Sequence, residues 1–388
     1  MLACFIFLAT SVTLAMAASS QAPDPLPIRD VFVAGDSIYD TFRIPAIVTT
    51  NDGTLLAFCE ARRNDRSDNG DIDIVLKRSS DMGRTWSDLQ VIWDDGTNTS
   101  GNPCPVVDRE TGRIWLPMTW NLGSDHERKI MDGKSAFPRR VYIASSGDDG
   151  RTWSKPIEIS DSTRQDHWRW YATGPGNGIQ IERGPHRGRL VVPANHSDHD
   201  RGEGVHPYRS HVFYSDDHGQ TWKLGGILDA GTNESTIVEL EDGSILDNMR
   251  SYHGKNRRAI ATSSNGGETW SETKLDDALI EPVCQANMIR ANFSDPETGT
   301  PGRILFSNPA SVKRERLTVR LSLDDGATWP HAKVIYPGSA AYSCMTMLPD
   351  GDVGLLFERD TYFRISFTHF PIDELEQETE DAPDQSGG

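Results

Sequence analysis

The sequence has no excess of basic residues and, beyond its first eighteen positions, no long apolar run. Its 388 residues include 39 Lys and Arg against 57 Asp and Glu, and the net charge is −18. A phosphate backbone requires a basic protein face, so this balance disfavours a nucleic-acid partner. No stretch after residue 18 approaches the about 20 apolar residues that span a bilayer, so we expect no transmembrane segment in the mature protein.

Cysteine and helical periodicity are also scarce. Beyond the first eighteen positions, four widely spaced cysteines form no CxxC pair and show no metal-ligand spacing: Cys59, Cys104, Cys284 and Cys344. We expect them to be buried free thiols, and we expect no metal and no cofactor. No segment shows a sustained helical period, whereas 34 Gly and 22 Pro favour many short strands joined by tight turns.

The first eighteen residues differ from the rest of the chain. They contain no charged residue, are mostly apolar through Leu14 and end in Ala15-Met16-Ala17-Ala18, a small-residue pattern typical of signal-peptide cleavage. We therefore expect a signal peptide at 1–18 that exports the protein from the cell, into the periplasm or into the lysosomal lumen. The alternative interpretation is a buried N-terminal strand.

The other end of the chain is acidic. Residues 373–388 hold seven carboxylates and no Lys or Arg. Such a segment cannot bury enough apolar surface to fold, so we predict an acidic disordered tail at 372–388. The folded domain is then expected at 28–371.

One eight-residue pattern, Ser-x-Asp-x-Gly-x-Thr-Trp, recurs along the chain. It occurs at 79–86, 146–153, 215–222 and 322–329, and a fifth copy at 263–270 has Asn in place of Asp. The Asp can accept N–H bonds across a turn, the Gly can adopt φ > 0, and the Trp can pack on a neighbouring sheet. The Trp residues are 67, 69, 48 and 59 positions apart, a spacing that fits one hairpin unit per copy.

These repeats predict an all-β fold, a six-bladed β-propeller of four-stranded antiparallel blades. Six units over the folded domain give about 57 residues per blade, and one unit without the pattern is expected because closing units are often atypical. The repeated turn resembles the Asp-box of sialidases. Asp-boxes also occur in non-catalytic propellers, so we interpret the boxes as structural and look for function elsewhere.

Three arginines resemble the triad that binds the sialic acid carboxylate in sialidases, a task suited to the bidentate guanidinium. Arg43 lies in Phe-Arg-Ile-Pro, which resembles the family's (F/Y)RIP motif, and Arg250 follows a DG hairpin in Asn-Met-Arg. The third is Arg314 in the family register, three residues before Leu-Thr-Val. Arg316 is the alternative.

The resemblance also implies the catalytic groups. Tyr342, in Gly-Ser-Ala-Ala-Tyr-Ser, matches the tyrosine nucleophile, and Glu234, in Asn-Glu-Ser-Thr-Ile-Val-Glu-Leu, matches its partner base. A tyrosine avoids the repulsion between a carboxylate nucleophile and the substrate carboxylate, but its pKa of about 10 calls for a base. Glu358 matches the carboxylate that orients the first arginine.

The general acid is expected on the loop after the first hairpin. In the family this Asp lies eleven residues before the Ser of the first box, which selects Asp68; Asp65 and Asp71 are interpreted as solvated loop residues. Arg62, in Glu-Ala-Arg, matches a further pocket arginine that family members direct at the sugar.

The aromatic segment Trp168-Arg-Trp170-Tyr171 either lines the pocket rim or packs between blades. The histidine-rich stretch that includes His196 and His211 has no regular ligand spacing, and we expect no metal there.

Taken together, the resemblance implies an exo-α-sialidase that removes terminal sialic acid with retention through a tyrosyl-enzyme intermediate. Its substrates would be sialylated oligosaccharides, glycoproteins or glycolipids, and it is expected to be a monomer. A non-catalytic glycan-binding Asp-box propeller is one alternative, but binding needs only the arginines and not Tyr342, Glu234 and Asp68. A trans-sialidase is the other, and it shares the covalent intermediate.

Overall fold

The computed structural model describes residues 27–198 and 204–376, so the predicted signal peptide at 1–18 and the tail beyond 376 lie outside the described residues. Within them β-strands dominate, and the predicted all-β class is confirmed. The helices are short: α1 (Glu127–Met131), α2 (Ser160–Thr163), the 3-10 helix η1 (Gly184–His186) and α3 (Asp373–Glu376). None of these helices has the length and apolarity to cross a membrane.

Strand pairing joins the described strands into four sheets, and within these sheets we distinguish six antiparallel groups of successive strands, each with four strand positions. Two of the sheets hold two groups each, joined in one sheet by a long strand that belongs to both groups and in the other by a parallel pairing. Group 1 is β2 (Thr41–Thr49), β3 (Leu55–Arg62), β4 (Ile72–Ser79) and β5 (Gln90–Trp93). Group 2 is β6 (Thr99–Gly101) and β7 (Val106–Val107) at the first position, then β8 (Ile114–Asn121), β9 (Arg140–Ser146) and β10 (Ile157–Glu158). Group 3 is β11 (Trp168–Thr173) and β12 (Ile179–Gln180), then β13 (Leu190–Asp198), β14 (Tyr208–Ser215) and β15 (Lys223–Ala230).

The remaining three groups follow the same order. Group 4 is β16 (Thr232–Glu239), β17 (Ile245–Ser251), β18 (Arg257–Ser263) and β19 (Lys274–Ile280). Group 5 is β20 (Asn287–Asn292), β21 (Arg303–Pro309), β22 (Glu315–Ser322) and the first half of β23 (His331–Met347). Group 6 is the second half of β23, then β24 (Val353–Arg359), β25 (Arg364–Phe370) and β1 (Arg29–Val33).

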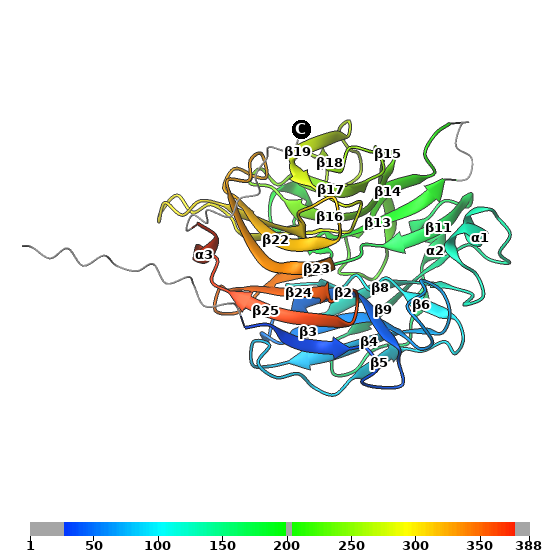
Figure 1. The fold of residues 1–388 in the computed structure, drawn as a ribbon. Coiled ribbons are helices and arrows are strands. Elements are labelled where there is room, and N and C mark those ends of the chain that lie inside the picture. Colours follow the sequence, from blue (N-terminus) through cyan, green and yellow to red (C-terminus); the bar gives the residue numbers. More distant parts are fainter. Residues whose placement is uncertain (1–26, 199–203, 377–388) are drawn as a thin grey trace, which may run out of the picture.

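Group 6 is assembled from both ends of the chain. Its fourth strand, β1, pairs with β25 through contacts such as Arg29 with Phe367, so the blue start of the chain lies beside the red end in Figure 1. In groups 1 to 5 the Ser-x-Asp pattern joins the third strand to the fourth. In group 6 those two strands are the chain ends and no turn connects them. This explains why five copies accompany six groups.

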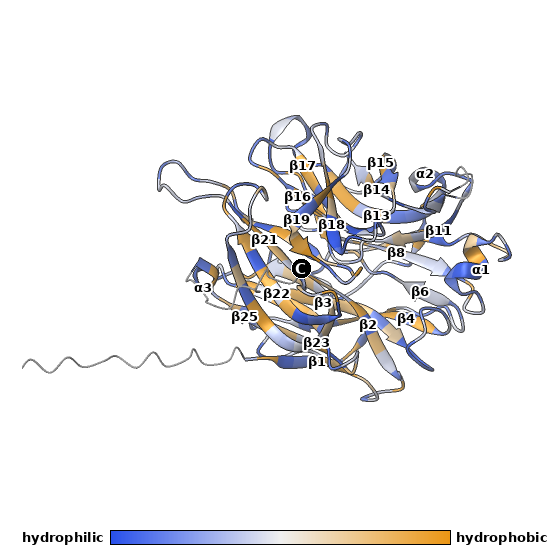
Figure 2. Ribbon diagram, turned by 45° about the horizontal axis from the view of Figure 1, so that its top comes forward, coloured by the Kyte–Doolittle hydropathy of each residue, from blue (hydrophilic) through white to orange (hydrophobic). Residues whose placement is uncertain are grey.

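Apolar side chains fill the spaces between successive groups, and Figure 2 shows the hydrophobic colour along the strands with hydrophilic colour on many of the loops. One cluster joins groups 1 and 2 through Phe58 and Leu116, and another joins groups 6 and 1 through Phe367 and Phe42. The other clusters lie between groups 2 and 3, 3 and 4, 4 and 5, and 5 and 6. All four cysteines in the described residues are buried and free, as predicted: Cys59, Cys104, Cys284 and Cys344.

The four Asp-containing turns are held by the same local hydrogen bonds. In the second copy the Asp148 carboxylate accepts from the Thr152 N–H at 2.8 Å, the Thr152 hydroxyl at 2.6 Å and the Ser146 hydroxyl at 2.8 Å. Asp149 and Gly150 both adopt positive φ. The Trp153 ring packs edge-on against Phe58 of group 1, at 5.6 Å between ring centroids. The predicted structural role of the turn is confirmed.

The predicted start of the disordered tail is wrong. Residues 373–376 form α3, in which Leu375 is buried and belongs to the cluster between groups 5 and 6. Glu376 also pairs with Arg303 at 2.7 Å. Glu374 also pairs with Lys333, so apolar packing and ion pairs together keep this short acidic stretch on the folded domain.

Candidate active site

The predicted site residues gather around one cavity of about 760 Å³. Seven of the eight line it: Arg43, Arg62, Asp68, Glu234, Arg250, Arg314 and Tyr342. The eighth, Glu358, is fully buried and accepts a hydrogen bond from the Arg43 Nε at 2.7 Å. Arg316 is not among the lining residues, so the geometry favours Arg314 over the alternative.

Irregular first strands present these side chains to the cavity. The pairing of the first strand with the second shifts register between Arg43 and Ala46 in β2, between Thr232 and Ser235 in β16, and between Ala340 and Ser343 in β23. Glu234 and Tyr342 lie inside the last two shifts. A bulge re-aims a side chain and frees it from the regular alternation, which is why bulges are common beside active sites.

Three guanidiniums converge from different groups. Arg250 donates to Glu234 at 2.8 Å, and Arg314 donates to the Tyr362 hydroxyl at 2.8 Å. The Arg43 guanidinium lies 5.4 Å from the centre of the Tyr342 ring. The Arg250 Nε is buried and has no hydrogen-bond partner among the residues described. Three positively charged groups therefore line one cavity, as a site for an anion requires.

Glu358 fixes two of the site's strands together. One carboxylate oxygen accepts from Arg43 Nε and from the Ile44 N–H at 2.9 Å, while the other accepts from the Tyr342 N–H at 3.1 Å. The buried carboxylate thus compensates the Arg43 charge and sets the position of the Tyr342 backbone.

Tyr342 and Glu234 form the shortest contact of the pocket. The Tyr342 hydroxyl donates to a Glu234 carboxylate oxygen at 2.5 Å. Burial, and then the Glu234 charge, raise the pKa of Tyr342 well above its ordinary value. The phenol is therefore neutral near pH 7, and Glu234 is placed to take its proton.

Asp68 stands on the loop between β3 and β4 with its side chain 77 % exposed. Its carboxylate contacts Arg62 at 2.8 Å and Arg43 at 3.9 Å. Desolvation raises the pKa of Asp68, but the Arg62 and Arg43 charges outweigh it and hold this pKa below the ordinary value. Arg62 is itself anchored by the buried Glu60 at 2.7 Å.

Comparison with known proteins agrees with this geometry. The family described as BNR repeat-like domain matches residues 53–355. The sialidase of Micromonospora viridifaciens is 36 % identical over 345 residues, which cover 87 % of this chain and 52 % of that protein. The solved Hadza microbial sialidase Hz136 is 32 % identical with a TM-score of 0.79, over 88 % of this chain and 68 % of that one. The chain belongs to the sialidase family.

A more distant solved structure shares the fold. It is the intramolecular trans-sialidase from Ruminococcus gnavus, 21 % identical with a TM-score of 0.75 over 90 % of this chain and 99 % of that one. The sialidase-family chain spans about half the length of its Micromonospora relative.

For the aromatic segment 168–171 of group 3, the sequence allowed two interpretations, lining of the pocket rim or packing between blades. Each is correct for different residues of the segment. Trp168 and Tyr171 pack in the cluster between groups 2 and 3, whereas Trp170 lines the pocket. The pairing of β11 with β13 shifts register between Trp168 and Tyr171, so side chains in this segment do not alternate regularly between the two faces of the strand. His196 stacks on Trp168 at 3.4 Å between ring centroids and contacts His211, so both histidines belong to this packed interior.

Sequence reasoning missed several pocket residues on groups 2 and 3. Arg139, just before β9, is 2 % exposed and lines the cavity, as does Glu127 of α1, which accepts from the Tyr208 hydroxyl at 2.7 Å. Neither residue lies in a motif. Only contacts between distant segments, such as that of Arg139 with the Trp170 ring at 4.2 Å, reveal them.

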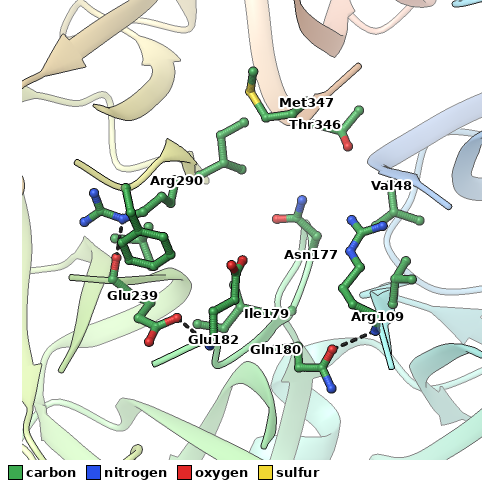
Figure 3. Close-up of a pocket in the computed structure, with 15 residues that line it drawn as sticks. Val48, Arg109, Asn177, Ile179, Gln180, Glu182, Glu239, Arg290, Thr346 and Met347 are labelled. Carbon is green, nitrogen blue, oxygen red and sulfur yellow. Dashed lines mark hydrogen bonds between the residues drawn. The ribbon is translucent and has the colours of Figure 1, made fainter. Parts of the chain in front are cut away.

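A second cavity, of about 830 Å³, lies further along the same first strands (Figure 3). Val48 and Met347 line it, each five residues beyond Arg43 and Tyr342 on β2 and β23, or roughly 16 Å of strand. None of the predicted site residues lines it. Its Glu239 accepts from the Glu182 and Arg183 N–H groups at 2.7 and 2.8 Å. The first cavity is the candidate active site.

Proposed function

We propose that this protein is an exo-α-sialidase that releases terminal sialic acid from oligosaccharides, glycoproteins or glycolipids. The observation that carries the proposal is the meeting of Arg43, Arg250 and Arg314 around the hydrogen-bonded pair of Tyr342 and Glu234. Sialic acid bears a carboxylate on its anomeric carbon, and three guanidiniums offer that anion charge-assisted hydrogen bonds. The carboxylate so held brings the anomeric carbon to the tyrosine.

The proposed first step is attack of the Tyr342 oxygen on the anomeric carbon. Glu234 takes the phenolic proton, which offsets the raised pKa of the buried phenol. Asp68 gives a proton to the leaving oxygen, and the glycosidic bond breaks. Water then attacks the anomeric carbon of the tyrosyl–sialoside with Asp68 as base, the bond to the Tyr342 oxygen breaks, and Glu234 returns its proton to that oxygen. Two displacements give net retention.

Asp68 reaches its acid form only if its surroundings change. In the empty pocket the Arg62 and Arg43 charges hold its pKa low. A substrate carboxylate on Arg43 offsets part of that positive charge and brings a negative charge near Asp68. Both effects raise the pKa of Asp68 and favour the protonated acid when substrate is bound.

The fold supports a further structural proposal, that the six groups are blades of a closed six-bladed propeller. Each space between successive groups holds an apolar cluster, including the one between groups 6 and 1, and β1 pairs with β25. We propose further that residues 1–18 direct export and that the protein works as a monomer.

Hydrolysis of a 4-methylumbelliferyl α-sialoside by the full chain tests the function. We expect fluorescence release, with the α anomer of free sialic acid appearing first by NMR before it mutarotates. Absence of turnover, with sialic acid still bound, would support the glycan-binding alternative. Transfer of sialic acid to added lactose in place of water would support the trans-sialidase alternative, whose fold this chain shares.

A further inference from the structure

The Arg139 side chain is a buried cation that has no hydrogen-bonded partner among the residues described. It lines the candidate active site and the residue is 2 % exposed. Among the residues described, no carboxylate lies within ion-pair distance of its guanidinium and no hydrogen bond to that group occurs; its Nε is buried and unsatisfied. The Trp170 ring lies 4.2 Å from the guanidinium carbon. Buried donors are rarely left unmatched, so this group calls for a ligand.

The nearby carboxylates are already engaged elsewhere. Glu60 accepts from Arg62 at 2.7 Å and from the Asn102 N–H at 2.9 Å, and Glu127 accepts from the Tyr208 hydroxyl. Burial lowers the pKa of Arg139 to about 10, and Glu60 and Glu127 partly offset this. The guanidinium therefore stays charged near pH 7, with its donors directed at the cavity.

The position of Arg139 identifies the part of the ligand that it meets. The arginines proposed for the carboxylate come from groups 1, 4 and 5, and Tyr342 comes from group 6. Arg139 and Trp170 come from groups 2 and 3, which supply none of these four residues, and both line the same cavity. In sialic acid the substituent on C5 and the glycerol chain on C6 lie away from the carboxylate, and both carry oxygen atoms that accept hydrogen bonds.

We infer that Arg139 is a substrate-recognition residue that donates hydrogen bonds to an exocyclic oxygen of the sugar, on the C5 substituent or the glycerol chain. The inference rests on the proposed function, because it takes the carboxylate to lie at the arginine triad. Trp170 holds the guanidinium plane in place by stacking.

Steady-state kinetics of Arg139→Met on the 4-methylumbelliferyl sialoside tests the inference. We expect kcat/KM to fall about 10- to 100-fold, mainly through KM, because a hydrogen bond to a charged group is lost. Arg139→Lys keeps the charge and should recover part of the loss. The control is Arg140→Met, since Arg140 stacks on Phe137 at 4.5 Å outside the cavity and pairs with Glu158.

Two altered substrates identify the oxygen. One has its glycerol chain shortened by periodate oxidation and reduction, and the other lacks the acyl group on C5. One of these substrates lacks the oxygen that Arg139 binds. On that substrate the kcat/KM values of wild type and Arg139→Met should differ by less than about twofold, as in a double-mutant cycle. Equal losses on all three substrates, or no loss on the intact one, would overturn the inference. If Arg139→Met does not fold, the same comparison is made with Arg139→Lys.

These experiments test the role of Arg139 separately from the proposed sialidase activity. Hydrolysis by wild type without the expected coupling would reject only the role of Arg139. If wild type hydrolyses no sialoside, calorimetry with free N-acetylneuraminic acid replaces the kinetics. Arg139→Met should then weaken binding about 10- to 100-fold, and unchanged binding, or no binding by wild type, would reject the role of Arg139 as well.

Discussion

The Ser-x-Asp turns and the arginine pocket differ in how far apart in the chain their hydrogen-bond partners lie. In each turn the carboxylate or amide at the third position is hydrogen-bonded within the eight residues, as where Asp148 is bound by Ser146 and Thr152. In the pocket the partners are far apart in the chain: Arg43 and Glu358 are separated by 315 residues. The pocket also leaves the Arg250 Nε buried without a described partner.

This difference indicates that the turns mainly contribute to stability and the pocket mainly to function. Donors and acceptors that are matched inside the protein stabilise it but have little left for a ligand. Unmatched buried donors cost stability and are kept where a ligand completes them. Variants in the pocket should therefore change kinetics more than stability, and variants in the turns should do the reverse.

The largest expected effect is that of Tyr342→Phe, which removes the proposed nucleophile. We expect kcat on an alkyl-linked sialoside to fall on the order of 10⁴-fold or more. Mass mapping after reaction of wild type with a 3-fluorosialyl fluoride should find the label on Tyr342. The matched control is Tyr171→Phe, which removes a buried hydroxyl bonded to the Thr163 carbonyl far from the reaction. If kcat falls by a similar factor in Tyr342→Phe and Tyr171→Phe, then the loss is not specific to the pocket.

The arginine triad comes next. Truncating Arg43, Arg250 or Arg314 to Ala removes one partner of a buried charged contact, and kcat/KM should fall on the order of 10²- to 10³-fold. Arg316→Ala is the control, because Arg316 lies two residues from Arg314 and outside the pocket. If kcat/KM falls strongly in Arg316→Ala and stays near the wild-type value in Arg314→Ala, then Arg316 is the third arginine of the triad.

Asp68→Ala should discriminate between substrates. Alkyl-linked sialosides have poor leaving groups and need the proton, so their kcat/KM should fall about 10²- to 10⁴-fold. Aryl sialosides leave without much help and should lose far less. Equal losses on both classes would mean that Asp68 only positions Arg62, which it contacts at 2.8 Å.

The same contrast explains what could be predicted from the sequence. The turns are local, so their residues, their Gly conformation and the packing of their Trp follow from eight positions. The triad, Tyr342 and Glu234 were found because they resemble family motifs. Arg139 was missed because its neighbours Trp170 and Glu60 lie 31 and 79 positions away, and no motif links them. The start of the tail was misplaced because Leu375 and ion pairs with the distant Arg303 and Lys333 anchor an otherwise acidic stretch.

The smallest expected effect lies in the turns. Asp148→Ala removes three local hydrogen bonds from a partly exposed site, and the free energy of unfolding should fall by about 1–2 kcal/mol. Denaturant titration measures it, and kcat/KM should stay within about twofold. Asp148→Asn should lose less, because Asn265 in the copy at 263–270 accepts from the Thr269 N–H at 2.9 Å and donates to the Thr269 hydroxyl at 2.9 Å.

The pH dependence of stability then distinguishes Asp148 from its Asn replacement. Hydrogen bonds from the Thr152 hydroxyl and N–H lower the pKa of Asp148 to about 2, against about 3.9 in the unfolded chain. A lowered folded-state pKa stabilises the protein above the unfolded value, and this contribution is lost as pH falls from about 4 to about 2. Asn does not titrate, so the stability gap between wild type and Asp148→Asn should narrow over that interval. A gap that is the same at pH 6 and pH 3 would show that the turn gains nothing from the ionised carboxylate, and its hydrogen bonds alone would then account for its stability.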